Sequence, residues 1–268
     1  MKRSDQVVVV TGASSGIGLE TASLLSSKGM KVYGLSRSKP RGKYSFNHLI
    51  ADVTSIETLQ KAADLIRESQ GGIDVLINCA GIGIGGAVEE TDEADYDNLF
   101  NVNVKGVFQT TKVFLPLLRE GKDKKIINIG SIAGILPIPF QTFYSMSKAA
   151  IQSFSEALRN ELRPFGIEVT TVLPGDTKTA FTSNRKNNPI SEESPYAERQ
   201  ARSLKKMEID EQTGKSPISV ANVIFKLINR RRLPVQVAIG FEYKLFVFLN
   251  RILPKRLVNW ILYQIYGK

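Results

Sequence analysis

Thr11-Gly12-Ala13-Ser14-Ser15-Gly16-Ile17-Gly18 is a glycine-rich turn between a run of valines that ends at Thr11 and a helical pattern that begins at Ile17. Glycines at such a junction allow a tight turn and a close approach of the backbone, and the start of a helix presents free N–H groups. An anion is the ligand that this arrangement favours, and a pyrophosphate is the expected one. The residues expected to hold it are Gly12, Ser14, Ser15, Gly16, Ile17 and Gly18.

Short apolar runs and helical patterns alternate along the chain as far as about residue 175. β-Branched residues dominate the short runs, which is typical of buried strands. Strands separated by helices pair in parallel through right-handed crossovers, so we predict a doubly wound α/β sheet in three layers, within one domain of residues 1–240. The predicted strands are Val7–Thr11, Lys31–Leu35, His48–Ala51, Val75–Asn78, Lys125–Ile129, Glu168–Leu173 and Val235–Ile239, and the predicted helices are Ile17–Lys28, Ile56–Ser69, Ala94–Leu118, Tyr144–Phe165 and Val220–Asn229.

Composition narrows the classes of protein and of site. The chain has 268 residues, of which 42% are hydrophobic, so it can bury a substantial core. Cys79 is the only cysteine, which rules out an internal disulfide and favours a reducing compartment. His48 is the only histidine; it argues against a histidine-based triad or metal site, and we expect it in a solvated loop. Without a signal-peptide pattern or a run of 18 apolar residues, we expect a cytoplasmic protein.

The predicted second strand leads into Ser36-Arg37-Ser38-Lys39. An acidic residue at this position would accept a hydrogen bond from the 2′-hydroxyl of an adenosine ribose and would repel a 2′-phosphate. A guanidinium with hydroxyls beside it suits a 2′-phosphate instead. We therefore predict that Arg37 selects NADP(H) over NAD(H).

Two segments depart from the alternating pattern. Residues 177–216 are polar and carry both signs of charge. A connection of this length calls for structure of its own, and we predict a lid with a helix at Ala197–Met207. The second segment is the C-terminal extension, residues 241–268. From Lys226 to the end, the chain holds nine Lys or Arg and one acid, Glu242, so most of the net charge of +10 lies here.

The C-terminal extension interleaves basic residues with large apolar ones. After Pro254, Lys255 and Arg256 fall in the first turn of a predicted helix, and Trp260 and Ile261 follow at helical spacing. This composition is typical of a helix in the interface of an anionic membrane, but packing against the domain or a partner subunit would use the same side chains. Both interpretations stay open. Nucleic acid is a poor fit, because the basic residues are separated by apolar ones.

Tyr144 and Lys148 are four residues apart, a spacing that places them on one face of a helix. A free tyrosine titrates near ~10 and exchanges protons poorly at neutral pH. An ammonium group one turn away favours the phenolate, so we expect Lys148 to lower the pKa of Tyr144. The pair can then pass a proton to or from a substrate oxygen.

Together with the glycine-rich turn, the Tyr-x-x-x-Lys pattern resembles the short-chain dehydrogenase/reductase family, whose members have a Rossmann fold. The resemblance spans residues 6 to about 240, and Cys79 stands where the family has a second asparagine. Further matches follow in chain order: Asp52-Val53, Asn78-Cys79-Ala80-Gly81, Asn103-Val104-Lys105-Gly106, Ser131, Pro174-Gly175, Thr177 and Thr179.

The resemblance implies a role for each matching residue. Tyr144 would be the general acid in reduction and the general base in oxidation, with Lys148 lowering its pKa and binding the nicotinamide ribose. Ser131 would hold the substrate carbonyl, and Asn103 would position a water that links Lys148 to solvent. A homodimer or homotetramer is expected on the same ground. The implied cofactor contacts are Asp52, Val53, Asn78, Ala80, Gly81, Tyr144, Lys148, Pro174, Gly175, Thr177 and Thr179.

The loop before Tyr144 is strongly apolar for a loop, from Ile135 to Phe140. It indicates a hydrophobic substrate, such as a lipid, a steroid or a retinoid-like carbonyl, unless the same residues seal a core or a dimer. We therefore predict an NADP(H)-dependent oxidoreductase that interconverts a carbonyl and an alcohol. The alternatives are a reductase of small aldehydes or ketones and a non-catalytic member of the fold that senses NADP or serves as a scaffold.

Overall fold

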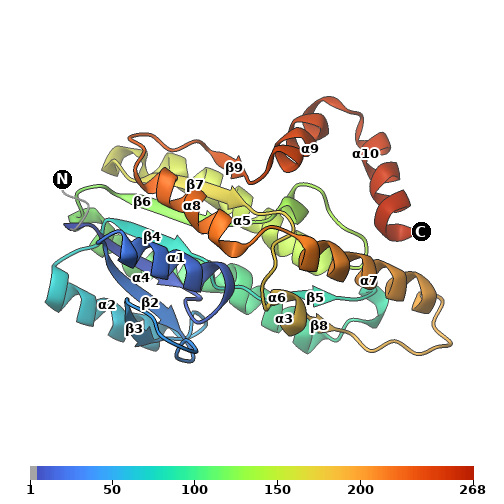
Figure 1. Cartoon of the computed structure of the whole chain (residues 1–268), viewed down its shortest axis with the longest axis horizontal. Coiled ribbons are helices and arrows are strands. Elements are labelled where there is room, and N and C mark those ends of the chain that lie inside the picture. The colour runs from blue at the N-terminus through green and yellow to red at the C-terminus, as the bar shows by residue number, and fades with distance from the viewer. Residues whose placement is uncertain (1–4) are drawn as a thin grey trace.

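The computed structural model describes residues 5–268 and confirms the doubly wound fold (Figure 1). Seven parallel strands form one sheet in the order β3-β2-β1-β4-β6-β7-β9. Strand order reverses between β1 and β4, and open α/β sheets bind their ligands beyond the carboxyl ends at such a point. The strands are β1 (Val7–Thr11), β2 (Lys31–Ser36), β3 (Asn47–Ile50), β4 (Val75–Asn78), β6 (Lys125–Ile129), β7 (Glu168–Leu173) and β9 (Gln236–Ala238); a separate short pair joins β5 (Ile84–Gly85) to β8 (Lys186–Asn187).

Helices cover both faces of the sheet and complete the three layers. α1 (Gly16–Ser27) and α8 (Pro217–Ile228) pack together on the face toward the viewer in Figure 1. The opposite face carries α2 (Ile56–Gln70), α4 (Gly106–Glu120) and α5 (Thr142–Leu162). Successive strand residues point to opposite faces, which is why the valine run of β1 is buried throughout. The first interface includes Val8, Val10, Leu25, Ile224 and Ile228, and the second includes Val9, Leu76, Phe114, Leu117 and Leu158.

The remaining helices lie in the loops beyond the carboxyl ends of the strands and in the C-terminal extension. The predicted lid has secondary structure, and its helix continues to Thr213 instead of ending at Met207. These elements are α3 (Glu93–Phe100), α6 (Phe181–Asn184), α7 (Ala197–Thr213), α9 (Phe241–Ile252) and α10 (Lys255–Leu262), with 3₁₀ turns at Val88–Glu90, Ile132–Gly134 and Arg163–Phe165 and π-helical turns at Asn101–Lys105 and Tyr263–Gly267.

The predicted helix over Ala94–Leu118 is confirmed, since the chain is helical from Glu93 to Glu120, but a π-helical turn at Asn101–Lys105 lies between α3 and α4. The turn brings the Asn103 side chain onto the loop after β4, where it accepts a hydrogen bond from the backbone N–H of Ile82 at 2.8 Å and donates to its carbonyl at 3.0 Å. A π-helical turn contains one more residue per hydrogen-bonded turn than an α-helix, and such turns are frequent at functional sites.

His48 lies in the predicted third strand, so the expectation of a solvated loop is wrong. It lies in β3, half-buried, with Nε2 2.8 Å from Oγ of Ser36. Burial lowers the pKa of this imidazole, and the nearby charge of Lys39 lowers it further. The polar sequence around His48 belongs to an edge strand, which needs no continuous apolar run.

The C-terminal extension projects from the end of the sheet that carries the loops (Figure 1). α9 and α10 meet at Pro254. The last turn contacts the lid: Tyr266 donates a hydrogen bond to Asp210 at 3.1 Å, and Nε of Arg199 donates to the carbonyl of Gly267 at 2.9 Å. Within residues 5–268, none of the helices has the length and apolar character that crossing a bilayer requires.

Candidate active site

A cavity of about 1190 Å³ opens at the carboxyl ends of β1, β4, β6 and β7 and continues to the C-terminal extension. Two of the predicted site residues, Asn78 and Asn103, lie outside its lining. The others all line it: Gly12, Ser14, Ser15, Gly16, Ile17, Gly18, Arg37, Asp52, Val53, Ala80, Gly81, Ser131, Tyr144, Lys148, Pro174, Gly175, Thr177 and Thr179.

The glycine-rich turn forms a backbone cradle with no room for side chains. A Cβ on Gly18 would lie 2.3 Å from the carbonyl oxygen of Gly12, and Gly12 itself has a φ of +68°. Ser15 caps α1 without a side-chain hydrogen bond, so the first N–H groups of the helix stay available to an anion. Oγ1 of Thr11 joins β1 to the next loop by accepting from the backbone N–H groups of Cys79 and Ala80, at 3.0 and 3.1 Å. This cradle fits the pyrophosphate of a dinucleotide.

Basic side chains line the cavity beyond the end of β2. Arg37 is joined there by Lys39 and Arg41, all three exposed. On the neighbouring wall, Asp52 accepts hydrogen bonds from the backbone N–H and the hydroxyl of Thr54, at 2.9 and 2.8 Å. The three cations make this end of the cavity suited to an added phosphate group.

Asn78 lies at the end of β4, outside the lining of the cavity. Its side chain is buried between β4 and β6, where Nδ2 donates to Asn128 at 2.8 Å and to Thr111 at 3.3 Å. Strand pairing directs this side chain into the core, and the contact of Asn78 with the cofactor stays a prediction. The hydrogen bond of Asn78 to Asn128 joins β4 to β6, two strands that end at the cavity.

Asn103 and Lys148 approach each other across Gly81. A Cβ on Gly81 would lie 3.3 Å from Oδ1 of Asn103 and 3.6 Å from Nζ of Lys148. Besides Ile82, the amide of Asn103 donates to Oγ of Ser147 at 3.1 Å, so α5 and the π-helical turn are joined one residue before the lysine. The predicted role for Asn103, positioning a water beside Lys148, stays a prediction.

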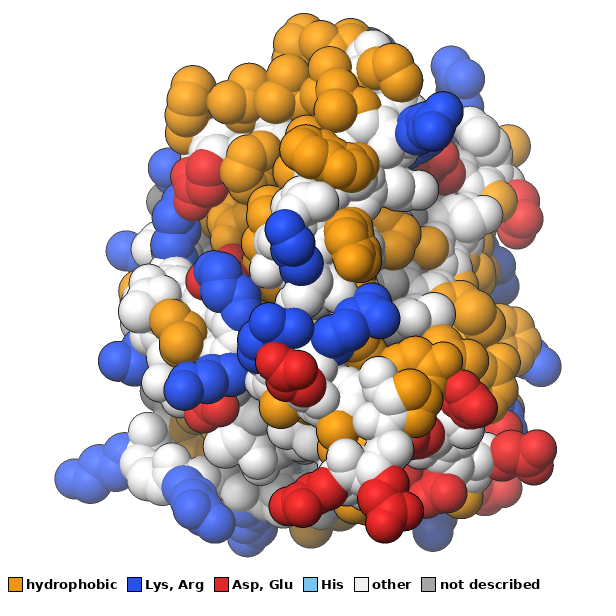
Figure 2. Space-filling model, turned by 90° about the vertical axis from the view of Figure 1, so that its right-hand side faces the viewer, with side chains coloured by type: hydrophobic (Ala, Val, Ile, Leu, Met, Phe, Trp, Pro, Cys, Tyr) orange, Lys and Arg blue, Asp and Glu red, His pale blue; other side chains and the backbone are white. Residues whose placement is uncertain are grey.

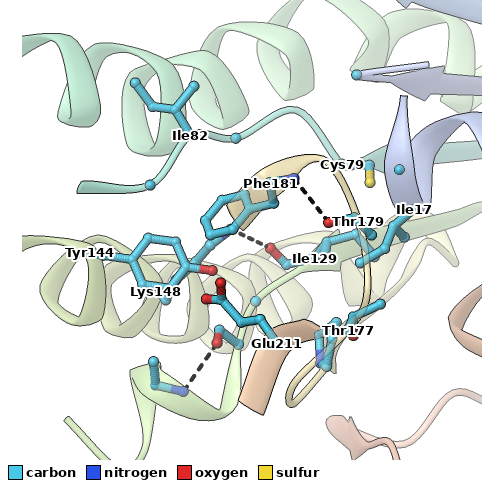
Figure 3. A pocket seen from close by; sticks show the side chains of 18 of the residues that line it. Ile17, Cys79, Ile82, Ile129, Tyr144, Lys148, Thr177, Thr179, Phe181 and Glu211 are labelled. Atoms are coloured by element: carbon cyan, nitrogen blue, oxygen red, sulfur yellow. Dashed lines mark hydrogen bonds between the residues drawn. The ribbon is translucent and has the colours of Figure 1, made fainter. Parts of the chain in front are cut away.

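Tyr144, Lys148 and Ser131 lie together in the middle of the cavity (Figure 3 shows the first two). Nζ of Lys148 is 5.7 Å from the centre of the Tyr144 ring and donates to the carbonyl of Ile129 at 3.0 Å. Oγ of Ser131 accepts from the backbone N–H of Ala133 at 3.1 Å and lies within hydrogen-bonding reach of the Tyr144 hydroxyl. Three groups able to hold or move a proton thus surround one point.

The expected net lowering of the Tyr144 pKa is wrong for this structure. Burial raises the pKa of Tyr144 to about 12, and the hydrogen bond with Ser131 opposes that rise only in part. Burial also lowers the pKa of Lys148 to about 8. Both shifts have the same cause, because the loss of surrounding water disfavours the charged form of either group. The spacing of the two residues in sequence says nothing about how deeply they are buried.

The lid contributes three side chains to the same region (Figure 3 labels Phe181 and Glu211). The ring of Phe181 packs on that of Tyr144, with centroids 5.5 Å apart. Arg185 and Glu211 form a buried ion pair of 2.7 Å, and the Glu211 carboxylate points toward Tyr144. Burial raises the pKa of Glu211, while the charge of Arg185 opposes that rise. Among the described residues, Oε2 of Glu211 has no hydrogen-bond partner.

Sequence reasoning missed the part of the wall that comes from the C-terminal extension. Tyr243 places its ring directly over Gly175, where a Cβ would lie 2.1 Å from the nearest ring atom. The apolar spacing of the extension was visible in the sequence, but not its contact with a loop 67 residues earlier. The extension's residues in the cavity wall are Tyr243, Phe246, Leu249, Asn250, Leu253, Val258, Ile261, Leu262, Ile265 and Tyr266.

Comparison with known proteins identifies the family. Residues 6–189 match the short chain dehydrogenase family. The chain is 40% identical over 264 residues to 3-ketodihydrosphingosine reductase of Bacteroides thetaiotaomicron, covering 98% of both chains. A solved short-chain dehydrogenase from Streptomyces avermitilis is 31% identical, with a TM-score of 0.79 over 95% of this chain and 96% of that one. One from Burkholderia phymatum, in complex with NAD, is 28% identical, with a TM-score of 0.80 over 93% and 94%.

Proposed function

The chain belongs to the short-chain dehydrogenase family, and from that premise we propose that it reduces the ketone of a long-chain lipid with NADPH. As a member, it is an oxidoreductase of carbonyl and alcohol groups with a nicotinamide cofactor. One observation carries the finer proposal. The cavity has a polar centre at Tyr144, and from there it continues between apolar side chains of α9 and α10, a shape that suits a ketone with a long hydrocarbon tail.

The similarity to the Bacteroides reductase supports this substrate class. Its alignment covers 98% of this chain and therefore includes nearly all of the lid and the extension that form the apolar arm. That protein is named for 3-ketodihydrosphingosine, a lipid ketone. We take the same compound as the first substrate to test.

Arg37, Lys39 and Arg41 support NADPH as the cofactor. They line one end of the cavity next to β2, where the adenosine ribose of a dinucleotide lies in this fold. A 2′-phosphate brings close to two negative charges to this point, and guanidinium groups bind phosphates through paired hydrogen bonds.

The proposed mechanism gives each central residue one task. A nicotinamide cofactor held by the glycine cradle would supply the hydride that reduces the carbonyl carbon. Ser131 donates a hydrogen bond to the carbonyl oxygen, and Tyr144 transfers its hydroxyl proton to that oxygen as the alcohol forms. Lys148 would stabilise the resulting phenolate and would return a proton to it, a role supported by the nearness of Asn103 across Gly81. With a pKa of about 12, Tyr144 is fully protonated at neutral pH and ready to act as the acid.

Glu211 is proposed to bind a hydrogen-bond donor next to the ketone. Its Oε2 is a buried acceptor without a hydrogen-bond partner among the described residues, and the carboxylate as a whole points toward Tyr144. A buried carboxylate oxygen is stabilised most by a cationic donor. An amino group on the carbon beside the ketone would meet this requirement, with Arg185 holding the other oxygen in place.

The experiment is a comparison of NADPH consumption with 3-ketodihydrosphingosine and with a short aliphatic ketone. We expect the long-chain ketone to give the larger kcat/KM, and the Tyr144→Phe variant to lose at least 1000-fold of it while still binding NADPH. Turnover of both ketones by the Tyr144→Phe variant would overturn the mechanism. A parent protein that binds NADPH but reduces neither ketone would overturn the proposed function.

A further inference from the structure

The C-terminal extension has apolar side chains on two sides. One side lines the cavity and includes Leu249 and Val258. The other side faces solvent: the side chains of Phe248 and Trp260 are both 58% exposed, and that of Ile252 is 60% exposed. Figure 2 shows hydrophobic side chains gathered at the top of the molecule, the end at which Figure 1 places α9 and α10. Large side chains exposed together in this way mark an interaction surface.

Basic side chains surround this exposed apolar surface. Lys244, Arg251, Lys255 and Arg256 are exposed on α9 and α10. Glu242 is the only acid of residues 241–268, and it pairs with Lys215 of the lid at 2.8 Å. The surface therefore offers uncompensated positive charge around aromatic and aliphatic anchors.

Part of the apolar surface is also the wall of the cavity. Phe246, Ile261 and Ile265 line the cavity, yet their side chains are 45%, 37% and 48% exposed. The apolar wall of the cavity thus keeps accessible surface on α9 and α10, the two helices that also carry Phe248 and Trp260. A path from the outer surface into the cavity would run between these apolar side chains.

We propose that α9 and α10 dock on an anionic membrane surface and that the cavity opens into this contact. The proposal that the path delivers substrate rests on the proposed function; the docking itself does not. Two short amphipathic helices with Trp and Phe among Lys and Arg have the composition of helices that lie in the plane of a bilayer interface. The charge favours an anionic membrane over the apolar face of a second copy, which would carry the same positive charge.

Vesicle flotation with the full chain tests the docking. We expect binding to vesicles of phosphatidylcholine and phosphatidylglycerol at least ten times stronger than to phosphatidylcholine alone, weakened by salt. Two double variants, Phe248→Ser with Trp260→Ser and Lys255→Glu with Arg256→Glu, should each reduce binding at least tenfold. None of the four residues lines the cavity, so NADPH binding and reduction of a short ketone should stay unchanged.

The matched control is Arg230→Glu with Arg231→Glu, the same change of charge at exposed residues that precede β9, at the amino end of the sheet. It should bind vesicles as the parent does. Equal binding of all variants, or no preference for anionic vesicles, would overturn the proposal. A third outcome would also overturn it: the parent does not float and sediments as a dimer, and the double variant Phe248→Ser with Trp260→Ser sediments as a monomer. The exposed apolar surface would then bind a second copy of the chain.

A second measurement separates this proposal from the proposed function. The long-chain ketone is supplied either in anionic vesicles or in detergent micelles. We expect the extension variants to lose activity at least tenfold in vesicles and to keep it in micelles. Loss of vesicle binding without loss of activity in vesicles would overturn delivery through the docked surface. Vesicle binding by a parent that turns over no ketone would support docking while refuting the proposed function.

Discussion

Tyr243 of α9 and Asp176 of the loop after β7 are joined by two hydrogen bonds. The Tyr243 hydroxyl donates to the Asp176 carboxylate and accepts from the Asp176 backbone N–H at 3.0 Å. The ring meanwhile covers Gly175, a predicted cofactor contact. The C-terminal extension is therefore held by hydrogen bonds and ring packing against Gly175 and Asp176, two residues that line the cavity.

A methyl group at position 175 should break this attachment. In Gly175→Ala, the new Cβ would lie 2.1 to 2.5 Å from ring atoms of Tyr243, so the ring must leave. We expect a loss of about 1 to 3 kcal/mol in the free energy of unfolding and faster proteolytic cleavage around Phe241. Urea denaturation and limited trypsin digestion measure the two effects. Tyr243→Phe is the control: it keeps the ring and should lose only about 1 kcal/mol. A Gly175→Ala protein as stable as the parent would contradict the contact.

Replacing Lys148 should stabilise the protein while inactivating it. Burial lowers the pKa of Lys148 from 10.5 to about 8, so the folded state holds this ammonium unfavourably at neutral pH. We expect Lys148→Met to raise the free energy of unfolding by about 1 to 3 kcal/mol at pH 7, at about 1.36 kcal/mol per pKa unit less the lost hydrogen bond to Ile129.

The pH dependence of that gain has a definite sign. Between the folded pKa of about 8 and 10.5, the unfolded chain binds more protons than the folded one at Lys148, so stability of the parent rises with pH. The advantage of Lys148→Met should therefore shrink across this window in the protein without cofactor. Denaturation at pH 7, 9 and 10.5 measures it, with the exposed Lys205→Met as control. A constant difference at all three pH values would refute the role of burial.

Charge reversal at Arg37 should change the cofactor preference. With Arg37→Asp, a carboxylate replaces the guanidinium near the proposed 2′-phosphate, so we expect the KM for NADPH to rise about 100-fold and that for NADH to fall. Lys39→Ala with Arg41→Ala should raise the KM for NADPH about 10-fold and leave that for NADH unchanged. Fluorescence titration of both cofactors provides the check. Equal affinity of the parent for NADPH and NADH would show that Arg37, Lys39 and Arg41 do not select NADPH over NADH.

Glu211→Gln should weaken the binding of a positively charged ketone more than that of a neutral one. The amide keeps the size of the side chain and its contact with Arg185 but cannot attract a cation. We expect the KM for a long-chain 2-amino-3-ketone to rise at least 10-fold, with little change for the same ketone without the amino group. The ratio of kcat/KM for the two ketones is the measured quantity. An equal effect on both would assign Glu211 to lid structure alone.

The sheet, the glycine cradle and the Tyr144/Lys148 pair could be predicted because each depends on residues close in sequence. The unbroken valine run of β1 indicates a strand that is buried on both faces of the sheet. The four-residue spacing of Tyr144 and Lys148 is about one turn of a helix, so it places both on one face. The sequence could place Asn103 in a helix but not in a π-helical turn. The contact that accompanies the turn is with Ile82, which is 21 residues away in the sequence. Neither the burial of Tyr144 nor its contact with Phe181 could be predicted, because the lid brings these distant segments together.

The exposed faces of Phe246, Ile261 and Ile265 bear on how fast a lipid could reach Tyr144. A hydrocarbon chain that passes through water loses about 0.8 kcal/mol for each methylene that is hydrated. For roughly ten methylenes, that barrier is about 8 kcal/mol, or on the order of a millionfold in rate. On the proposed path from a docked membrane into the cavity, this aqueous step is absent. Turnover would then depend on the concentration of ketone within the bilayer and not on its minute solubility in water.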